Sequence, residues 1–413
     1  MKKIIALMMA LVMVFALAAC GAPAADEGGK TDEGTAPAAV SAENIKIGVI
    51  LIGDENEGYS YAHMEGIEAA CKALGIDKES QLIYKFSVLE DESCYDAAVD
   101  LAENGCNIIF ANSFGHEPHL MQAAEEYPDI YFCHATGYQA ATSELTNFCN
   151  YFTDIYESRY VSGVVAGLKL KELMDKGTVT DPYIGYVGAY PYAEVVSGYT
   201  AFFLGIRSIV PEAHMDVTYT NEWFNIAAEG EAANMLMSRG CVIIGQHADS
   251  TGAPAAVQAA LDGGKVAYSV GYNVDMLSVA PDAALTSAQN NWVVTYEALI
   301  KVALEGGKLD TDYSFGYADD AVQISALGAS CAEGTQKAVD DAIAAIKDGS
   351  LHVFDTSKWT VNGETVTTTV SDDLAETYHG VEYITDGYFH ESESASAPAF
   401  AFRIDGITEL KKS

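Results

Sequence analysis

Short β-branched runs alternate with helical stretches along most of the chain, and this alternation constrains the fold more than any other feature. In a first set we expect strands at 46–52, 82–86, 107–112, 130–135 and 147–152, with helices at 59–74, 95–103 and 118–126. Strands that alternate with helices form parallel sheets with helices on both faces. The first set therefore predicts an α/β lobe.

The same alternation restarts after residue 158. We expect helices at 159–174, 192–209, 227–237 and 254–261, and strands at 183–187, 215–219, 241–245 and 266–270. A more mixed stretch follows, with strands at 284–288 and 321–324, helices at 292–304 and 335–346, and a hairpin at 359–369. Its Asn362-Gly363 pair is typical of a two-residue hairpin turn. Two successive sets predict two α/β lobes.

The N-terminal segment has the pattern of a secretory signal peptide. Lys2 and Lys3 precede an uncharged apolar run, and Leu17-Ala18-Ala19-Cys20 ends it with small residues before a cysteine. A transmembrane helix needs about 20 apolar residues, so this run is short for one. The ending resembles the lipobox of bacterial lipoproteins, which implies that the thiol of Cys20 carries a lipid. An ordinary signal peptide or a membrane anchor is the alternative.

These patterns give an expected domain organisation. We expect a lipoprotein signal peptide at 1–19 and a flexible tether at 20–43, because the latter is rich in Gly, Ala, Pro, Thr and acidic residues. The first lobe is expected to comprise 44–153 with 280–318. The second is expected to comprise 154–279 with 319–413, including the C-terminal hairpin and tail.

The charge balance excludes two classes of partner. The chain has 22 Lys and Arg against 59 Asp and Glu, a formal net charge of −37. Nucleic acids and anionic lipid head groups both attract basic surfaces, so neither is an expected partner of the folded part. After Cys20 there are seven cysteines, an odd number without a C-x-x-C pair. At least one is therefore unpaired, and we expect no disulfide framework in so long a chain.

Polar segments follow most of the expected strands. In open parallel sheets, ligands bind outside the carboxyl ends of the strands. The segments at these ends are 53–59, 112–117, 188–192, 221–225, 246–250, 271–275 and 287–291, and several of them carry an aromatic residue. Aromatic and polar side chains together suit a flat, partly polar small molecule held between two lobes.

Catalytic motifs are not evident in the sequence. His116-Glu117-Pro118-His119 lacks the spacing of a zinc-binding H-E-x-x-H helix, and there is no G-x-S-x-G elbow or P-loop. Asp54, Glu55 and Glu57 could form a carboxylate cluster, although a solvated loop is the simpler interpretation. We therefore expect a binding protein rather than an enzyme, with no cofactor and no metal.

Three segments resemble a known family. They are 53–66 (GDENEGYSYAHMEG), 246–250 (QHADS) and 287–292 (SAQNNW), and the resemblance extends over about 45–410, including 386–389 and 396–400. The chain resembles the basic membrane protein family of substrate-binding lipoproteins, which supply ABC transporters with purine nucleosides and related bases. The resemblance implies a type I periplasmic-binding-protein fold, with two α/β lobes, three crossovers and a ligand cleft. An ABC permease is then the implied protein partner.

The resemblance also implies a purine held between aromatic rings with a carboxylate at its polar edge. Tyr59 and Trp223 are the candidates for stacking, and Phe114 is a further candidate for lining the cleft. Asp249 is the candidate anchor, because a carboxylate can accept from both N1–H and the 2-amino group of guanine. Adenine lacks N1–H and would leave that carboxylate unpaired. The alternative for Asp249 is an N-cap of the following helix.

Three further polar residues are secondary candidates for contact with the ligand, namely His63, Asn273 and Asn290. Nucleoside-binding members of the family place a lysine near the ribose, after the strand that corresponds to 284–288 here. The segment 286–292 (TSAQNNW) has no lysine. A nucleobase and a nucleoside therefore both remain candidates, of the guanine or hypoxanthine type.

The predicted mechanism is capture of the solute in the cleft followed by hinged closure of the lobes. A type I receptor for a sugar or another small solute is the first alternative, because aromatic-lined sites bind sugars as well. A cell-surface nucleoside hydrolase is the second, and it would need a reacting carboxylate or histidine pair.

Overall fold

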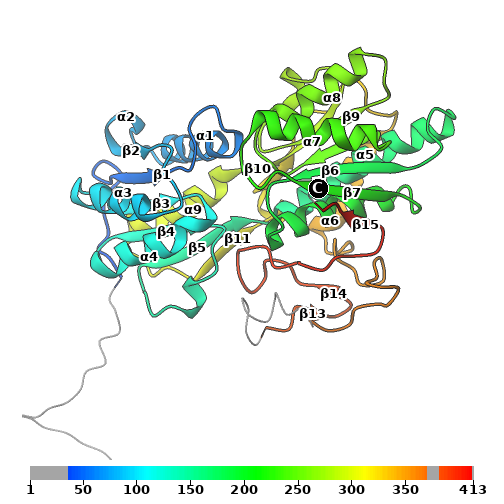
Figure 1. Cartoon of the computed structure of the whole chain (residues 1–413). Coiled ribbons are helices and arrows are strands. Elements are labelled where there is room, and N and C mark those ends of the chain that lie inside the picture. Colours follow the sequence, from blue (N-terminus) through cyan, green and yellow to red (C-terminus); the bar gives the residue numbers. More distant parts are fainter. Residues whose placement is uncertain (1–35, 370–380, 412–413) are drawn as a thin grey trace, which may run out of the picture. The chain divides into compact units, whose positions relative to one another are not determined.

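The computed structural model describes residues 36–369 and 381–411, which belong to one compact unit of 36–413 (Figure 1). The signal peptide expected at 1–19, Cys20 and the tether up to residue 35 lie outside the described residues. The end of the expected tether is not free of the fold. The Tyr131 hydroxyl donates to the carbonyl of Pro37 at 3.2 Å, and Gln81 Nε2 donates to the carbonyl of Ala42 at 2.7 Å.

The first lobe has a six-stranded parallel sheet in the order β11-β5-β4-β3-β1-β2. Its strands are β1 (Ile47–Ile50), β2 (Leu82–Lys85), β3 (Ile108–Ala111), β4 (Tyr131–Ala135), β5 (Phe148–Thr153) and β11 (Asp312–Phe315). Its helices are α1 (Gly58–Ala73), α2 (Lys78–Gln81), α3 (Glu92–Glu103), α4 (Glu117–Glu126) and α9 (Trp292–Glu305), with the short 3₁₀ helices η1 (Phe114–His116) and η2 (Ala140–Thr142).

Alternation along β1 explains why both faces of this sheet are covered. Ile47 and Val49 belong to the core that contains residues of α1 and α9, whereas Ile50 belongs to the core beneath α3 and α4. Successive side chains of a strand point to opposite faces. A strand buried on both faces must be apolar throughout, which is the pattern that predicted it.

The second lobe has a seven-stranded sheet in the order β12-β10-β9-β8-β6-β7-β15, parallel except for the β10–β12 pair. Its strands are β6 (Tyr183–Gly188), β7 (His214–Tyr219), β8 (Ile243–Gln246), β9 (Tyr268–Tyr272), β10 (Ala284–Asn290), β12 (Val322–Ile324) and β15 (Ile407–Glu409). Its helices are α5 (Ile155–Asp175), α6 (Ala193–Arg207), α7 (Ile226–Ser238), α8 (Gly252–Asp262) and α10 (Thr335–Lys347), with η3 (Met276–Ser278) and η4 (Tyr317–Asp319).

The chain crosses between the two sheets three times, from β5 to α5, from β10 to α9 and from β11 to β12. One expected boundary differs from the structure. Residues 280–318 were assigned to the first lobe, but β10 pairs with β9 and β12 in the second sheet. The crossover therefore comes after Asn290, because the apolar start of β10 completes the second sheet before the chain returns to pack α9 against α1.

The C-terminal region also differs from expectation. The hairpin expected at 359–369 is reduced to one bridge between Val361 and Glu364, around the predicted Asn362-Gly363 turn. A short hairpin forms instead from β13 (Ile384–Thr385) and β14 (Tyr388–Phe389). Phe400 packs against Phe354 and Trp359, with ring centroids 4.2 and 5.3 Å apart. Aromatic packing thus holds this region together, and the pairing of β15 with β7 joins its end to the second sheet.

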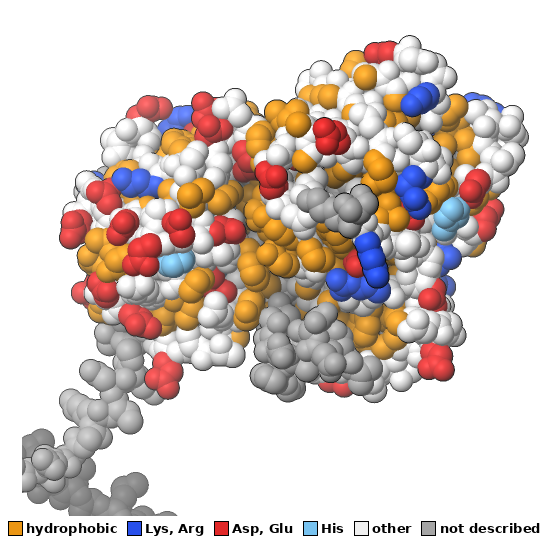
Figure 2. Space-filling model, in the orientation of Figure 1, with side chains coloured by type: hydrophobic (Ala, Val, Ile, Leu, Met, Phe, Trp, Pro, Cys, Tyr) orange, Lys and Arg blue, Asp and Glu red, His pale blue; other side chains and the backbone are white. Residues whose placement is uncertain are grey.

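Acidic side chains lie on the surface of the structure (Figure 2), and most cysteines lie in its interior. Figure 2 shows acidic side chains scattered over the visible face and hydrophobic ones gathered where the lobes meet. All seven cysteines of the described part of the chain are free, and six of them are buried.

In the ranges 36–369 and 381–411, no helix combines the length and apolarity that crossing a membrane requires.

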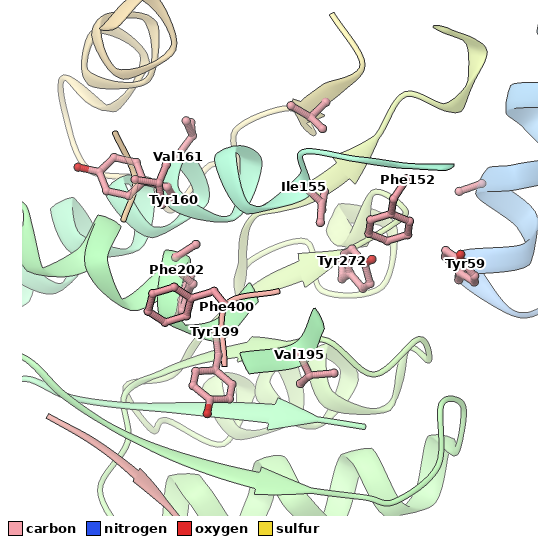
Figure 3. Packing of buried hydrophobic residues seen from close by; sticks show 14 of the residues in the cluster. Tyr59, Phe152, Ile155, Tyr160, Val161, Val195, Tyr199, Phe202, Tyr272 and Phe400 are labelled. Atoms are coloured by element: carbon pink, nitrogen blue, oxygen red, sulfur yellow. The ribbon is translucent and has the colours of Figure 1, made fainter. Parts of the chain in front are cut away.

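Helices α5 and α6 pack closely because glycines lie at their crossing. A Cβ atom on Gly205 would lie 2.1 Å from the carbonyl oxygen of Tyr160, and one on Gly163 would lie 2.1 Å from that of Phe202. Figure 3 shows Tyr160 and Val161 of α5 and Phe202 of α6 in the core built around this crossing. Only glycine allows backbones to approach so closely without displacement.

We expect Gly205→Ala to lower the free energy of unfolding by at least about 1 kcal/mol, because the helices must separate. Gly230→Ala in α7 is the matched control, since its nearest contact would be 3.4 Å away and alanine favours a helix. Urea unfolding of both variants measures the difference. Equal stability of the two variants would contradict the close-packing argument.

Candidate functional site

A cavity of about 350 Å³, including its opening, lies between the two lobes. Its lining residues come from both sheets, and most of them follow the carboxyl ends of strands. They are Ile52, Tyr59, Asn112, Ser113, Phe114 and Thr136 from the first lobe, and Glu194, Trp223, His247, Asp249 and Tyr272 from the second. This is the edge at which parallel α/β sheets bind their ligands.

The wall from the first lobe is held by hydrogen bonds around the start of α1. The carboxylate of Glu57 accepts from the backbone N–H groups of Tyr59 and Ser60, both at 2.7 Å, and so caps the helix. The Tyr59 hydroxyl donates to the carbonyl of Asn112 at 2.8 Å. Glu57 is therefore a helix cap, and the Tyr59 ring has a fixed position at the cavity.

Asp249 is the buried carboxylate of the opposite wall and is 7% exposed. Its backbone N–H donates to the carbonyl of Trp223 at 2.8 Å, and its Oδ1 accepts from Asn273 Nδ2 at 2.7 Å. Helix α8 begins after Thr251 without a side-chain cap, so Asp249 does not cap that helix. Across the lobes, the N–H of Gly58 donates to the backbone carbonyl of Asp249 at 3.3 Å.

The electrostatic surroundings of Asp249 are mostly acidic. Burial, followed by the charges of Glu57, Glu229 and Glu194, raises the pKa of Asp249 well above its usual value, whereas the charge of Arg159 opposes that rise. Burial lowers the pKa of His247 to about 4, so this histidine is neutral at physiological pH. Its Nε2 lies 3.1 Å from a carboxylate oxygen of Glu194.

Aromatic rings from both lobes meet beside the cavity. The Phe114 ring of the first lobe stacks with that of Tyr192 of the second, with centroids 5.4 Å apart and an interplanar angle of 29°. Tyr192 stacks in turn on Tyr190, and the ring of Tyr190 meets Trp223 edge to face at 5.0 Å. Phe114 and Trp223 thus line the cavity with aromatic neighbours behind them.

The structure brings four of the seven candidate contact residues to this cavity, namely Tyr59, Phe114, Trp223 and Asp249. His63 lies outside the lining. It is fully buried between α1 and α9, where it stacks on Trp292 at 4.0 Å and its Nδ1 lies 2.7 Å from the Tyr296 hydroxyl. His63 therefore supports the helix that carries Tyr59.

Asn273 and Asn290 also lie outside the lining, behind Asp249. Asn273 is 3% exposed and donates to Asp249, and Asn290 Nδ2 donates to Asn273 Oδ1 at 3.2 Å. In the structure, Asn273 therefore contacts Asp249, and Asn290 contacts Asn273. The sequence could not separate these roles, since it shows which residues follow a strand but not how deeply each side chain lies.

Several lining residues were not among the candidates. Four of them lie in the polar segments that we expected after strands, namely Asn112, Ser113, His247 and Tyr272. The sequence therefore predicted these segments but did not single out these residues. Glu194 had no such signal, because it belongs to the first turn of α6 rather than to the loop before it. Only the packing of α6 against the sheet places that carboxylate at the cavity.

A larger cavity, of about 1350 Å³ including its opening, lies where β11 and the start of α5 meet the C-terminal region. Carboxylates dominate its polar lining, and burial is the main cause that raises their pKa values, to about 7 for Asp154 and about 8 for Glu157 and Glu391. In the described ranges, no group of three or more His, Cys, Asp or Glu side chains is arranged to hold a metal ion.

These raised pKa values predict a pH dependence of stability. A carboxyl group whose pKa is higher in the folded state binds its proton more tightly there, so its stabilising effect is full below about pH 4.5 and is lost as the pH rises to about 8. Glu157→Gln should therefore be nearly neutral at about pH 5 and stabilising by on the order of 1 kcal/mol at about pH 8. Its amide oxygen can still accept from the Tyr317 N–H, as Oε2 does at 2.6 Å.

Thermal unfolding of Glu157→Gln at both pH values measures this effect. Glu231→Gln, at an exposed position of α7, is the control and should change stability little at either pH. A Glu157→Gln variant that is destabilised more at the higher pH than at the lower would contradict the sign of the effect.

Comparison with known protein families shows which family the chain belongs to. The family of PnrA-like ABC transporter substrate-binding proteins, known as Bmp, matches residues 45–352. The chain belongs to this family. This confirms the resemblance seen at 53–66, 246–250 and 287–292, and it identifies the cavity as lying in a solute-binding protein of an ABC importer. Such Bmp-family proteins act outside the cytoplasm.

Two curated relatives cover most of the Bmp-family chain. A purine-binding protein of Brucella abortus is 32% identical over 335 residues, which span 79% of this chain and 90% of the relative. A protein of Haloferax volcanii, named provisionally as an ABC transporter glucose-binding protein, is 32% identical over 288 residues, or 70% of this chain and 67% of the relative.

Solved structures confirm the fold. A solute-binding protein of an ABC transporter system from Aeropyrum pernix K1 superposes with a TM-score of 0.64, 15% identity and coverage of 75% of this chain and 93% of its own. A solute-binding protein from Conexibacter woesei gives 0.59, 19% identity and coverage of 75% and 98%. The Bmp-family chain therefore has the expected type I periplasmic-binding-protein fold.

Proposed function

We propose that this protein captures a purine in the cavity between its lobes and delivers it to the permease of an ABC importer. The observation that carries the proposal is the arrangement of Tyr59, Phe114 and Trp223 from two lobes around the buried carboxylate of Asp249. Aromatic faces suit the flat surfaces of a base, and a carboxylate suits the N–H groups at its edge. The purine-binding relative from Brucella supports the same assignment.

The lining bears on whether the purine carries a ribose. Among the residues that line this cavity, none is Lys or Arg. The lack of a cation that could hold ribose hydroxyls favours a free nucleobase of the guanine or hypoxanthine type over its nucleoside. The polar side chains of Ser113 and Thr136 could still accommodate ribose hydroxyls.

A sugar is the second candidate ligand. The Haloferax relative is named for glucose, and sugars also stack on aromatic rings and donate their hydroxyls to carboxylates. Asp249 and Glu194 could serve as such acceptors. The two candidates differ in one respect that an experiment can use, because only a purine offers two extended flat faces.

Calorimetric titration of the ligand-stripped protein distinguishes these candidates. The panel comprises guanine, hypoxanthine, adenine, guanosine, inosine, glucose and ribose. We expect guanine or hypoxanthine to bind most tightly, and the ratio between each base and its nucleoside reports on recognition of the ribose. Binding of glucose or ribose without any purine would replace the purine proposal with the sugar alternative.

We further propose that a lipid on Cys20 anchors the protein to the cell membrane, within reach of its permease. The pattern at 17–20 and the acidic, Gly- and Ala-rich segment that follows support this proposal. A single diacylglycerol-modified cysteine would hold the folded unit at the membrane, since two acyl chains give stable anchoring. Cys20→Ser should move the protein from the membrane fraction to the soluble fraction. Retention of the variant in membranes would contradict lipid anchoring at this residue.

A further inference from the structure

A chain of three side-chain hydrogen bonds runs from the crossovers to the cavity. The Thr153 hydroxyl donates to Asn290 Oδ1 at 2.5 Å, Asn290 Nδ2 donates to Asn273 Oδ1 at 3.2 Å, and Asn273 Nδ2 donates to Asp249 Oδ1 at 2.7 Å. We call these three donors, Thr153, Asn290 and Asn273, the donor relay. Every member is buried, with 7% exposure or less.

The backbone holds the central member of the relay in place. Asn273 has a φ of +61°, a left-handed conformation that asparagine adopts more readily than most residues. Its N–H donates to the carbonyl of Ala288 at 2.9 Å, and its own carbonyl accepts from Gln289 Nε2 at 3.1 Å. The side chain of Asn273 is therefore fixed against Asp249 by β10 rather than by a ligand.

The direction of the donors matters for Asp249. Each bond points its N–H or O–H toward the carboxylate, and aligned hydrogen bonds polarise one another in a buried site. A hydrogen bond to the ionised form of a carboxyl group favours that form. The donor relay thus opposes the effect of burial and favours the ionised form of Asp249, whose other oxygen can accept from a group in the cavity.

We infer that the donor relay determines which purines the cavity accepts, by presenting Asp249 to the base as a hydrogen-bond acceptor. An ionised carboxylate accepts from the N1–H that guanine and hypoxanthine carry. It repels the unprotonated N1 of adenine, whereas a neutral carboxyl group could donate to that nitrogen. The inference rests on the proposed purine function and names 6-oxopurines as the substrate class of that site.

The relay acts against the other groups that surround Asp249. Glu57 of the α1 cap, Glu194 of α6 and Glu229 of α7 disfavour its charge, and Arg159 of α5 favours it. The remaining titratable neighbours are Tyr59, Tyr272 and His247, which are neutral near pH 7 because burial raises the pKa values of the tyrosines and lowers that of the histidine. Removal of a relay donor should therefore raise the pKa of Asp249. As the solution is acidified, 6-oxopurine binding should then be lost at a higher pH than in the unaltered protein.

Two variants test the relay. Asn273→Asp keeps the size and the backbone tolerance of the residue but replaces its donor with a second acidic group, so that the pair must share a proton at neutral pH. Thr153→Val removes the first donor and keeps the shape of the side chain. Asn291→Asp is the matched control, since Asn291 neighbours the relay at the same crossover but donates instead to the carbonyl of Asp320 at 2.8 Å.

The purified full chain is titrated with hypoxanthine and with adenine from about pH 5 to about pH 8. For Asn273→Asp we expect the ratio of hypoxanthine to adenine affinity to fall by about tenfold or more, with a smaller fall for Thr153→Val and none for Asn291→Asp. Both relay variants should also lose hypoxanthine binding at a higher pH than the unaltered protein.

Folded relay variants with an unchanged affinity ratio and pH profile would overturn the inference while leaving purine capture intact. A protein that binds no purine at all would instead overturn the proposed function, and the inference with it. Circular dichroism of each variant shows that it is folded, and Thr153→Val keeps the test decisive should Asn273→Asp fail to fold.

Discussion

Asp249→Asn should lower the affinity for guanine or hypoxanthine about 100-fold or more, while the protein keeps its fold. The substitution preserves the shape of the side chain but removes the charge that accepts from the N–H groups of the base. Truncating one partner of a buried, hydrogen-bonded charge pair costs roughly 2–5 kcal/mol. Titration calorimetry at neutral pH measures the loss.

The control for this variant is Asp275→Asn, which changes an exposed carboxylate two residues beyond Asn273. Asp275 caps η3 by accepting from the N–H of Leu277 at 2.9 Å and does not line the cavity. Its affinity for purines should stay within about twofold of the unaltered protein. Equal affinities for Asp249→Asn and Asp275→Asn would remove Asp249 from the site.

Trp223→Ala should weaken purine binding by roughly 10- to 100-fold, because stacking of a base on an aromatic ring contributes roughly 1–3 kcal/mol. Trp223→Phe should retain most of the affinity, since phenylalanine keeps a flat aromatic face. Tyr61→Ala is the control, because Tyr61 is exposed on α1 and does not line the cavity.

Fluorescence adds an independent measurement for Trp223. The chain has three tryptophans, and both Trp292 and Trp359 are at most 2% exposed and lie outside the cavity. A purine that stacks on Trp223 should therefore quench tryptophan emission in the unaltered protein but not in Trp223→Phe. Full quenching in that variant would show that the base does not stack on this residue.

The fold was largely predictable because both sheets are built from strands with a clear apolar pattern. β1 is fully buried and apolar, and its continuous hydrophobic run is the usual signature of a parallel strand covered on both faces. Strand β11 was missed, since DYSF has half-buried residues and little apolar character. Its place at the sheet edge depends on pairing with β5, a contact between residues more than 150 positions apart.

The sequence predicted which segments meet at the site, but not how deeply each side chain lies in it. Asp249 and Asn273 both follow strands, and nothing in the sequence shows that one side chain faces the cavity while the other lies behind it. That difference depends on the left-handed backbone at Asn273 and on its bonds to β10. Glu194 lies at the cavity through the packing of a helix, which local patterns do not report.

A crystal structure of the protein with bound hypoxanthine or guanine tests the central claim most directly. We predict that the base lies in the cavity between the lobes, with its faces toward Trp223 and the first-lobe aromatics and its N1–H directed at Asp249. Asn273 should remain behind Asp249 without touching the base. A base bound elsewhere, or oriented with its polar edge away from Asp249, would contradict the proposed mode of recognition.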